Sequence, residues 1–265
     1  MGTVRGSLDS ISDAEVVIFD LDGTLTESKA SLDKEMASLL RELLQRKYVA
    51  VASGCSYQQF ETQFVRQLPK SSDLGRLFLF PTCSASGYYY DPKIKRFTRA
   101  YSNPLKKRDA ERIVQSFKTV FKEIDYVPPK KTYGQIFENR GSQLTFSALG
   151  QKAPLQVKEK WDPKQKKRQR IRRLLRKYLP EFEISIGGTT SIDVTRKGVN
   201  KTLCVTKLKE HLGVAKKHMV YVGDALFKGG NDYIMKSAKV RCIAVAGPRE
   251  TKKLIRRIIK SDSGA

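Results

Sequence analysis

The sequence predicts an α/β fold, in which a parallel sheet with helices on both faces is interrupted by an inserted α+β domain. Short apolar runs alternate with helical patterns at both ends of the chain, which is typical of βαβ units. The middle of the chain carries hairpin patterns instead. With 265 residues, 40% of them hydrophobic, the chain can bury one large core or two smaller ones.

Residues 1–83 are expected to form the first part of the α/β domain. The run EVVIFDLDG predicts a buried strand, and a helical pattern that opens with SLDKE, like a capping box, follows it. Further apolar and helical runs then alternate. The expected elements are strands at 15–23, 48–54 and 76–82, with helices at 31–46 and 56–68.

Residues 190–265 are expected to complete this domain. A helical pattern ends at Gly213, and Pro248 opens another. The expected elements are strands at 218–224 and 241–247, helices at 200–213 and 248–260, and a short helix between 229 and 238.

Residues 84–189 are expected to form the inserted α+β domain. Residues 87–101 alternate around an Asp-Pro turn, and residues 135–150 around an Arg-Gly-Ser turn, so both read as hairpins. Helical patterns cover 105–124 and 163–178. An insert of this size beside strand ends typically forms a lid or specificity cap over the site.

The chain is strongly basic, with 51 Lys and Arg against 27 Asp and Glu and a net charge of +24. This charge predicts an anionic partner: nucleic acid, an acidic membrane surface or a phosphorylated metabolite. Much of it lies on residues 158–177, where apolar residues recur with the spacing of one helix face. We favour a solvated helix face there, with polyanion binding as the alternative.

The composition favours a cytoplasmic protein. No stretch approaches the roughly 18 apolar residues of a membrane span, and the first 15 residues lack the apolar core of a signal peptide. The four cysteines are widely spaced and form no CxxC pair, so we expect reduced thiols and neither a disulfide framework nor a zinc site.

Polar residues follow several of the expected strands. In open parallel sheets, sites lie outside the carboxyl ends of the strands, so these residues should converge. The sequence places Asp20 and Asp22 after the first strand, Ser53 and Gly54 after the second, Asp224, Asn231 and Asp232 after the strand at 218–224, and Lys201 at the start of a helix. Alone, each has a plain structural reading as a turn, a cap or a surface residue.

Clustered carboxylates repel one another unless a cation lies among them, and oxygen ligands favour Mg²⁺. The set suits phosphoryl transfer, in which one aspartate attacks phosphorus while a metal ion, a lysine and a serine hold phosphoryl oxygens. Asp20 and Asp22 are two residues apart, so strand alternation directs both side chains the same way.

Four motifs in this order, "DLDGT", Ser53, Lys201 and "GDALFKGGND", resemble those of the haloacid dehalogenase superfamily. The position of the insert resembles subfamily IIB, which has a Rossmann-like core and an inserted cap of the C2B type. The resemblance implies Asp20 as nucleophile and metal ligand, and Asp22 as acid/base whose backbone carbonyl faces the metal. It also implies phosphate binding by Ser53, Gly54 and Lys201, and completion of a Mg²⁺ site by Asp224 and Asp232.

The insert also resembles the cap of eukaryotic-type phosphomannomutases. "ENRGSQL" and "ISIGGTTSIDV" are similar to that family's substrate-binding segments, which implies substrate contacts for Arg140, Ser191 and Asp193. The chain departs from the family at Gln151 and Lys158, where the mutases carry arginines. Lys29 replaces a further arginine, and "ASG" replaces Gly-Gly-Ser.

These departures favour a phosphatase acting on a small phosphorylated metabolite, preferably a sugar phosphate, over a mutase. A mutase must grip a second phosphate, and neither Gln nor Lys provides the bidentate guanidinium fork. A nucleic-acid-binding protein on an inactive hydrolase scaffold is a further alternative, although it would not need all the site residues. The resemblance also implies a possible homodimer through the cap.

Overall fold

The computed structural model describes residues 13–261, so most of the segment that bears on a signal peptide lies outside it. The chain divides into two compact units. We call Met1–Tyr101, Lys201–Lys228 and Asp232–Ala265 the core unit, and Ser102–Asn200 with Gly229–Asn231 the cap unit. Within the described residues, no helix has the length and apolar character needed to cross a membrane.

The core unit is built on a seven-stranded sheet in the order β11-β10-β1-β2-β3-β4-β5. The five strands from β11 to β3 run parallel, and β4 pairs antiparallel with β3. This confirms the predicted parallel sheet. The strands are β1 (Val16–Phe19), β2 (Tyr48–Ala52), β3 (Leu77–Phe80), β4 (Ser86–Asp91), β5 (Arg96–Ser102), β10 (Met219–Gly223) and β11 (Arg241–Ala244).

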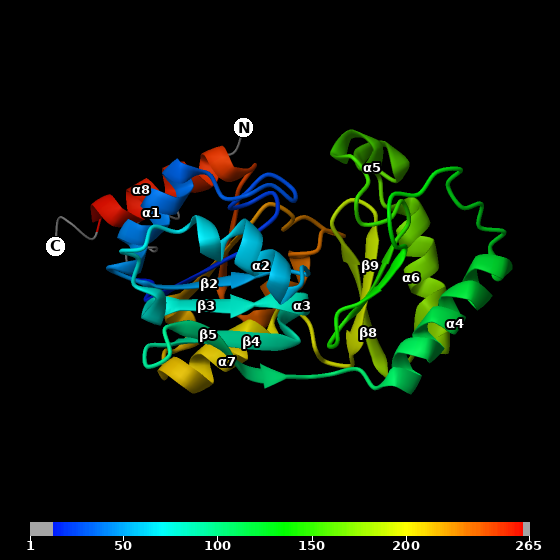
Figure 1. Ribbon diagram of the computed structural model, residues 1–265, viewed down its shortest axis with the longest axis horizontal. Coiled ribbons are helices and arrows are strands. Elements are labelled where there is room, and N and C mark those ends of the chain that lie inside the picture. Colours follow the sequence, from blue (N-terminus) through cyan, green and yellow to red (C-terminus); the bar gives the residue numbers. More distant parts are fainter. Residues whose placement is uncertain (1–12, 262–265) are drawn as a thin grey trace. The chain divides into compact units, whose positions relative to one another are not determined.

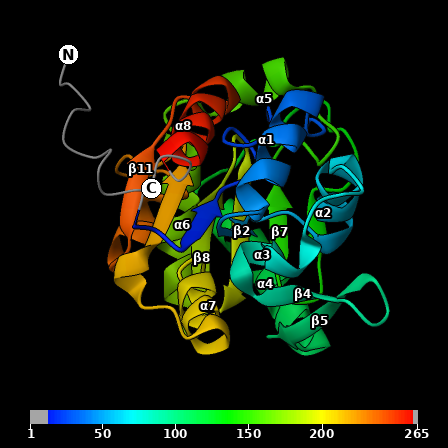
Figure 2. The same cartoon turned by 90° about the vertical axis from the view of Figure 1, so that its left-hand side faces the viewer.

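Helices cover both faces of this sheet, which explains why its central strands are apolar throughout. In β1, Val17 and Phe19 pack with residues of α1, α2 and α8, whereas Val16 and Ile18 pack with residues of α7. Figure 2 shows α1 and α8 on one side of the sheet and α7 on the other. The helices are α1 (Lys34–Leu44), α2 (Tyr57–Gln63), the short α3 (Pro81–Ser84), α7 (Leu203–Leu212) and α8 (Pro248–Ser261).

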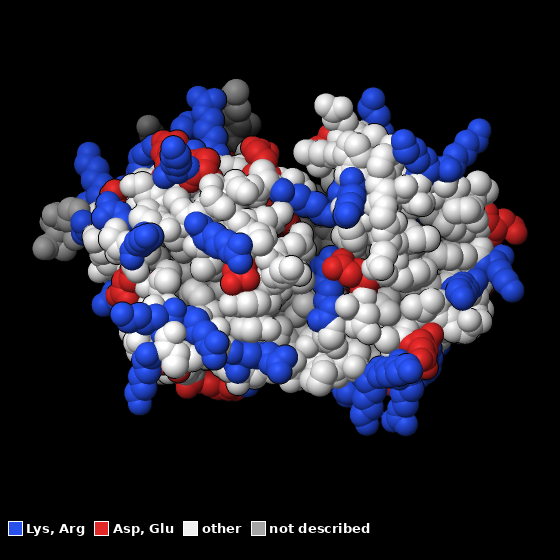
Figure 3. Space-filling model, in the orientation of Figure 1, with Lys and Arg blue, Asp and Glu red and all other residues white. Residues whose placement is uncertain are grey.

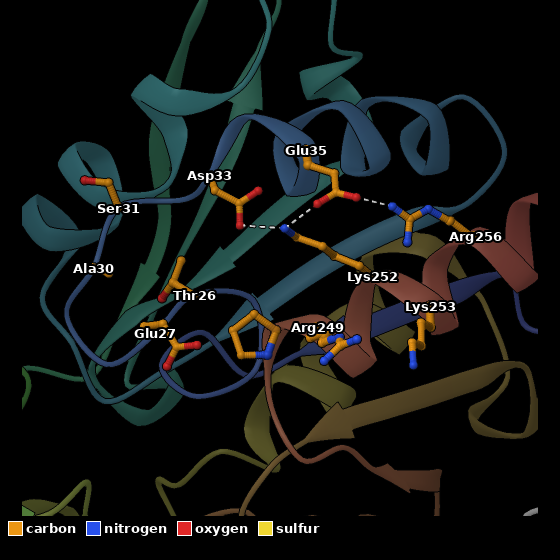
Figure 4. Close-up of a pocket in the computed structure, with 11 residues that line it drawn as sticks. Thr26, Glu27, Ala30, Ser31, Asp33, Glu35, Arg249, Lys252, Lys253 and Arg256 are labelled. Atoms are coloured by element: carbon orange, nitrogen blue, oxygen red, sulfur yellow. Dashed lines mark hydrogen bonds and ion pairs between the residues drawn. The ribbon is translucent and has the colours of Figure 1, made fainter.

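The start of α1 is held to α8 by ion pairs. Lys252 of α8 lies 2.9 Å from Asp33 and 2.6 Å from Glu35, and Arg256 also pairs with Glu35 (Figure 4). Asp33 also caps α1 by accepting a hydrogen bond from the backbone N–H of Met36 at 2.9 Å. The helix therefore begins later than the expected residue 31. These residues line a cavity of about 460 Å³ whose charges are largely matched by one another.

The cap unit consists of a four-stranded antiparallel sheet, in the order β6-β7-β9-β8, with α4 and α6 packed on one face (Figure 1). Its core joins Phe117 of α4 and Ile171 of α6 to Phe146 of β7. The elements are α4 (Lys107–Glu123), β6 (Phe137–Asn139), β7 (Leu144–Ser147), α5 (Leu155–Trp161), α6 (Lys166–Tyr178), β8 (Phe182–Gly187) and β9 (Ser191–Arg196).

Two expectations about the insert need correction. The hairpin at 87–101 is not part of the cap, because β4 extends the core sheet by pairing with β3, as Phe78 opposite Tyr89 shows. The insert also ends later, since β9 pairs with β7 and β8. The boundaries expected at 83/84 and 189/190 therefore lie at 101/102 and 200/201. The short helix α5 was not predicted.

A buried arginine ties the start of α6 to the β8–β9 turn. Arg168 is 2% exposed, and its guanidinium donates to the carboxylate of Asp162 at 3.1 Å and to the carbonyls of Gly187 and Gly188 at 3.1 and 2.8 Å. The same carboxylate accepts the backbone N–H groups of Lys167 and Arg168, both at 3.1 Å, and so caps the helix.

We expect Arg168→Met to destabilise the cap unit. The change removes the partner of a buried carboxylate and leaves two turn carbonyls without their donor, which typically costs about 3–5 kcal/mol in the free energy of unfolding. Thermal and urea unfolding would measure the loss. The exposed neighbour Arg170→Met is the control, with an expected change within about 0.5 kcal/mol. Equal stability of the two variants would contradict this role.

Candidate active site

The centre of the candidate site is a buried ion cluster in the core unit. Lys201 donates hydrogen bonds to Asp20 and, at 2.5 Å, to Asp232. Asp20 directly follows β1, Lys201 stands just before α7, and Asp232 follows the loop after β10. The three residues are 2%, 4% and 0% exposed. The structure therefore brings together side chains from three distant segments, two of them following predicted strands and one at the start of a predicted helix.

The charges in this cluster depend on one another. Burial raises the pKa of Asp20 well above its usual value, and the nearby Lys201 opposes that rise. Burial disfavours the ammonium of Lys201, but the attraction of Asp20 and Asp232 outweighs it and raises the pKa of Lys201. The lysine is therefore held charged between two carboxylates.

A third carboxylate, Asp224, extends the cluster. Its backbone N–H donates to the hydroxyl of Thr24 at 3.1 Å, and this hydroxyl lies 3.3 Å from its carboxylate. Burial and Asp232 raise its pKa. Carboxylate oxygens of Asp20, Asp224 and Asp232 lie within 4.8 Å of one another. With one ammonium against three carboxylates, the ionised cluster has a charge of −2, and an all-oxygen donor set of this kind fits a divalent cation.

Asp22 is positioned differently from the other carboxylates. It is half-buried, and its carboxylate accepts the backbone N–H of Lys29 at 2.5 Å. It is not a member of the three-carboxylate group. The resemblance implies that Asp22 contacts the metal through its backbone carbonyl and not through its carboxylate. This contact stays a prediction.

Ser53 and Gly54 follow β2, the strand next to β1. Val51 is paired with Phe19, so Ser53 lies one strand away from Asp20 at a similar level along the sheet. Ser53 is buried, and its hydroxyl accepts the backbone N–H of Cys55 at 3.3 Å. The two residues thus lie at the same edge of the sheet as Asp20.

A strained turn, which the sequence did not predict, supports the edge of the sheet where Ser53 and Asp20 lie. Thr82, Cys83 and Ser84 of α3 all have φ between +53° and +64°, a region that non-glycine residues rarely adopt. The N–H of Cys83 donates to the carbonyl of Ser53 at 2.9 Å, and the hydroxyl of Ser84 donates to the carbonyl of Lys201 at 3.2 Å. The turn therefore braces two of the predicted phosphate-binding residues.

Two glycines allow the carboxylates to approach the backbone. Gly23 has φ +83°, and a Cβ there would lie 2.7 Å from the carboxylate of Asp224. A Cβ on Gly223 would overlap the carboxylate of Asp232 and the ring of Tyr221. The "DG" and "GD" pairs of the sequence thus have a packing reason.

Tyr221 is a further member of the cluster that the sequence did not single out. Its hydroxyl donates to Asp232 at 2.6 Å and lies 3.3 Å from the ammonium of Lys201. Burial raises the pKa of this phenol well above its usual value. The only signal for it is its place in β10, three residues before Asp224.

The cap residues implied by the resemblance lie on or next to the sheet face opposite α4 and α6. Ser191 and Asp193 alternate along β9 with the core residue Ile192. Asp193 accepts hydrogen bonds from Gln143 at 2.8 Å and from Thr145 at 2.7 Å. This face of the cap unit is therefore polar and internally bonded.

Arg140 lies in the turn between β6 and β7, where its guanidinium pairs with Glu138 at 2.7 Å. Lys158, aligned with an arginine of the mutases, is 5% exposed and donates to the backbone carbonyl of Gln151 at 3.2 Å. The second aligned position, Gln151, carries no charge.

The sequence is similar to that of known proteins along most of its length. Residues 36–261 match the eukaryotic phosphomannomutase family. The phosphomannomutase of Encephalitozoon cuniculi is 27% identical over 255 residues, covering 92% of this chain and 93% of that protein. The phosphomannomutase of Spinacia oleracea is 27% identical over 250 residues, covering 91% and 94%.

Solved structures agree on the fold. A truncated Plasmodium falciparum IMP-nucleotidase is 16% identical with a TM-score of 0.70, over 95% of this chain and 72% of that one. A haloacid dehalogenase-like hydrolase from Bacteroides thetaiotaomicron is 15% identical with a TM-score of 0.59, over 92% and 99%. The fold is thus that of the haloacid dehalogenase-like hydrolases, and the protein is an enzyme of the phosphatase or phosphomannomutase kind. The family match covers most of the chain, which therefore belongs to the eukaryotic phosphomannomutase family.

Proposed function

We propose that this protein is a Mg²⁺-dependent phosphatase that hydrolyses a small phosphorylated metabolite, with sugar phosphates as the favoured class. The observation that carries the proposal is the buried cluster of Asp20, Lys201 and Asp232, with Asp224 beside it. A structural ion pair needs only one carboxylate for each lysine. The excess of negative charge at the edge of the sheet is what a metal-assisted phosphoryl transfer requires.

In the proposed reaction, an oxygen of Asp20 attacks phosphorus and forms an Asp20–phosphate bond, while the bond from phosphorus to the leaving oxygen breaks. Asp22 gives that oxygen a proton. Asp22 then takes a proton from water, whose oxygen attacks the phosphorus and releases inorganic phosphate and the free Asp20 carboxylate. The ammonium of Lys201, with Ser53 and Gly54, would hold the phosphoryl oxygens.

Asp20, Asp224 and Asp232, together with the backbone carbonyl of Asp22, would hold the Mg²⁺ ion. When bound, a divalent ion supplies the positive charge that keeps Asp20 ionised and stabilises charge on the transferred phosphoryl group. Because burial raises the pKa of Asp20, a neighbouring cation also favours the ionised nucleophile.

The residues of the cap favour hydrolysis of the phosphate ester over a mutase reaction, in which the phosphoryl group moves to another position of the sugar. A mutase has to grip a second phosphate. Lys158 is instead buried against the carbonyl of Gln151. Gln151 is neutral. Lys158 and Gln151 offer weaker binding for a second dianion than the arginines they replace.

The alternative function is that of the named relatives, a phosphomannomutase. A panel of sugar phosphates, nucleotides and phosphoglycerates, assayed for phosphate release with Mg²⁺ and with EDTA, separates the two. Mannose 1-phosphate with a hexose bisphosphate would be assayed in parallel for its 6-phosphate. Mg²⁺-dependent phosphate release is the expected result. Formation of the isomer without release would establish the mutase instead.

We expect Arg140→Ala to raise KM for the best substrate of this panel by about 10- to 100-fold, with a smaller change in kcat. A charged hydrogen bond contributes about 1.5–3 kcal/mol to binding. If it is equally strong to the substrate and to the transition state, its loss raises KM and leaves kcat nearly unchanged. Arg140→Lys keeps the positive charge but lacks the two-pronged guanidinium group, so its KM should lie between those of the original chain and Arg140→Ala. An unchanged KM would exclude Arg140 from the substrate site.

A further inference from the structure

The outer face of α6 is a dense row of cations. The segment 163–180 contains nine Lys and Arg and no Asp or Glu. Of the nine, Arg168 is buried and Arg172 is half-buried. Lys166, Arg170, Arg173 and Lys177 are exposed and fall at i, i+4, i+7 and i+11, so they form one stripe about 16 Å long on the helix. We call these four residues the basic stripe.

The stripe is not explained by the folding of the cap unit. α6 packs through Ile171, Leu174 and Leu175, which face away from the stripe into the cap core. Within residues 13–261, no carboxylate forms an ion pair with any of its four residues. Four like charges spaced about 4.5–6 Å apart repel one another and weaken an isolated helix. Such a cost favours a role outside the fold.

The rest of the cap unit adds to this charge. Residues 102–200 contain 23 Lys and Arg against 10 Asp and Glu, more than half of the net charge of the chain. Lys and Arg also gather over the start of α4 (Figure 3). There, a cavity of about 640 Å³ is lined by Lys106, Arg108, Arg112, Arg196 and Lys197 together with two acidic residues and Phe182. Arg112 donates to the carbonyl of Tyr178 at 3.0 Å, so this cavity adjoins the end of α6.

We propose that the basic stripe of α6 binds the phosphodiester backbone of a nucleic acid. Cations at short, regular intervals suit a chain of regularly spaced phosphates. The guanidinium groups of Arg170 and Arg173 can each donate two parallel hydrogen bonds to one phosphate. Firm membrane binding would need an apolar face as well. α6 has none to offer, because its aliphatic side chains are buried.

The test is the anisotropy of labelled oligouridylate and oligothymidylate of about 20 nucleotides, titrated with the full chain at several salt concentrations. Each phosphate contact to a single strand contributes about −0.7 to the slope of log K against log salt. Four contacts predict a slope near −2.8, a rise in Kd of about 50-fold between 50 and 200 mM salt. The RNA and DNA arms identify which nucleic acid is preferred.

The triple variant R170Q/R173Q/K177Q should bind far more weakly, with a slope near −0.7. Its matched control is R249Q/K253Q/R257Q, which removes two exposed Arg and one Lys from one face of α8 in the core unit. This control should keep the slope of the original chain. Circular dichroism melting and the phosphatase assay verify that both variants are folded.

Equal losses in the two triple variants would overturn the proposal, because they would show an effect of net charge alone. Competition by poly-L-glutamate as strong as that by RNA would overturn it in favour of an acidic protein partner. Binding to phosphatidylserine vesicles without binding to either oligonucleotide would overturn it in favour of a membrane. Binding of oligonucleotide that depends on the α6 residues and on salt as stated supports it.

Discussion

Asp20→Asn is expected to reduce phosphate release on the order of 10⁴-fold or more, because the amide cannot act as the attacking oxygen. Asn has nearly the shape of Asp and still accepts a hydrogen bond from Lys201, so the fold should persist. Initial rates with Mg²⁺ present and a thermal melt of the same sample measure the two effects separately.

The matched control is Asp125→Asn, at an exposed position of the cap unit with φ +50°, a conformation that Asn tolerates. It should retain full activity. If Asp20→Asn kept more than a small fraction of the original rate while Asp125→Asn was unaffected, the nucleophile would have to be another group.

Lys201→Met should remove activity and also destabilise the core unit. It leaves Asp20 and Asp232 buried without their ammonium, and breaking a buried pair typically costs about 3–5 kcal/mol in the free energy of unfolding. Urea unfolding in EDTA measures this without interference from metal binding. Lys209→Met, an exposed change on the same segment, should stay within about 0.5 kcal/mol.

The loss in Lys201→Met should depend on pH with a definite sign. Burial raises the pKa of Asp20 in the folded chain, so the folded variant retains a proton that the unfolded chain releases near pH 4. Its stability should therefore fall as the pH rises above about 4. A pH-independent difference between Lys201→Met and Lys209→Met would contradict this account of the cluster.

The fold of the core unit could be predicted because local patterns and tertiary packing agree. β1 is buried on both faces, and a run such as VVIF reads as a buried parallel strand. The alternation at 87–101 predicts a hairpin correctly, but the hairpin belongs to the core unit and not to the cap. Its alternation shows that it is a hairpin and does not reveal which sheet edge β4 joins. α5 was missed because its seven residues are mostly exposed and lack a helical stripe.

The charged members of the site could be predicted because carboxyl ends of parallel strands share one edge, which brings Asp20 and Asp224 together. Tyr221 and the turn at 82–84 could not. A tyrosine inside a strand reads as packing, and consecutive left-handed residues such as Thr82 and Cys83 leave no sequence signature without glycine. The homodimer through the cap stays a prediction.

The measurement that tests the central claim most directly is covalent trapping of the phosphoryl group. The enzyme is mixed with its best radiolabelled sugar phosphate, quenched in acid, reduced with borohydride and mapped by peptide sequencing. The account predicts label on Asp20 before reduction and homoserine at position 20 after it. It also predicts that the label leaves as inorganic phosphate when the mixture is chased with unlabelled buffer. Label on another residue, or label that leaves only on a sugar, would contradict it.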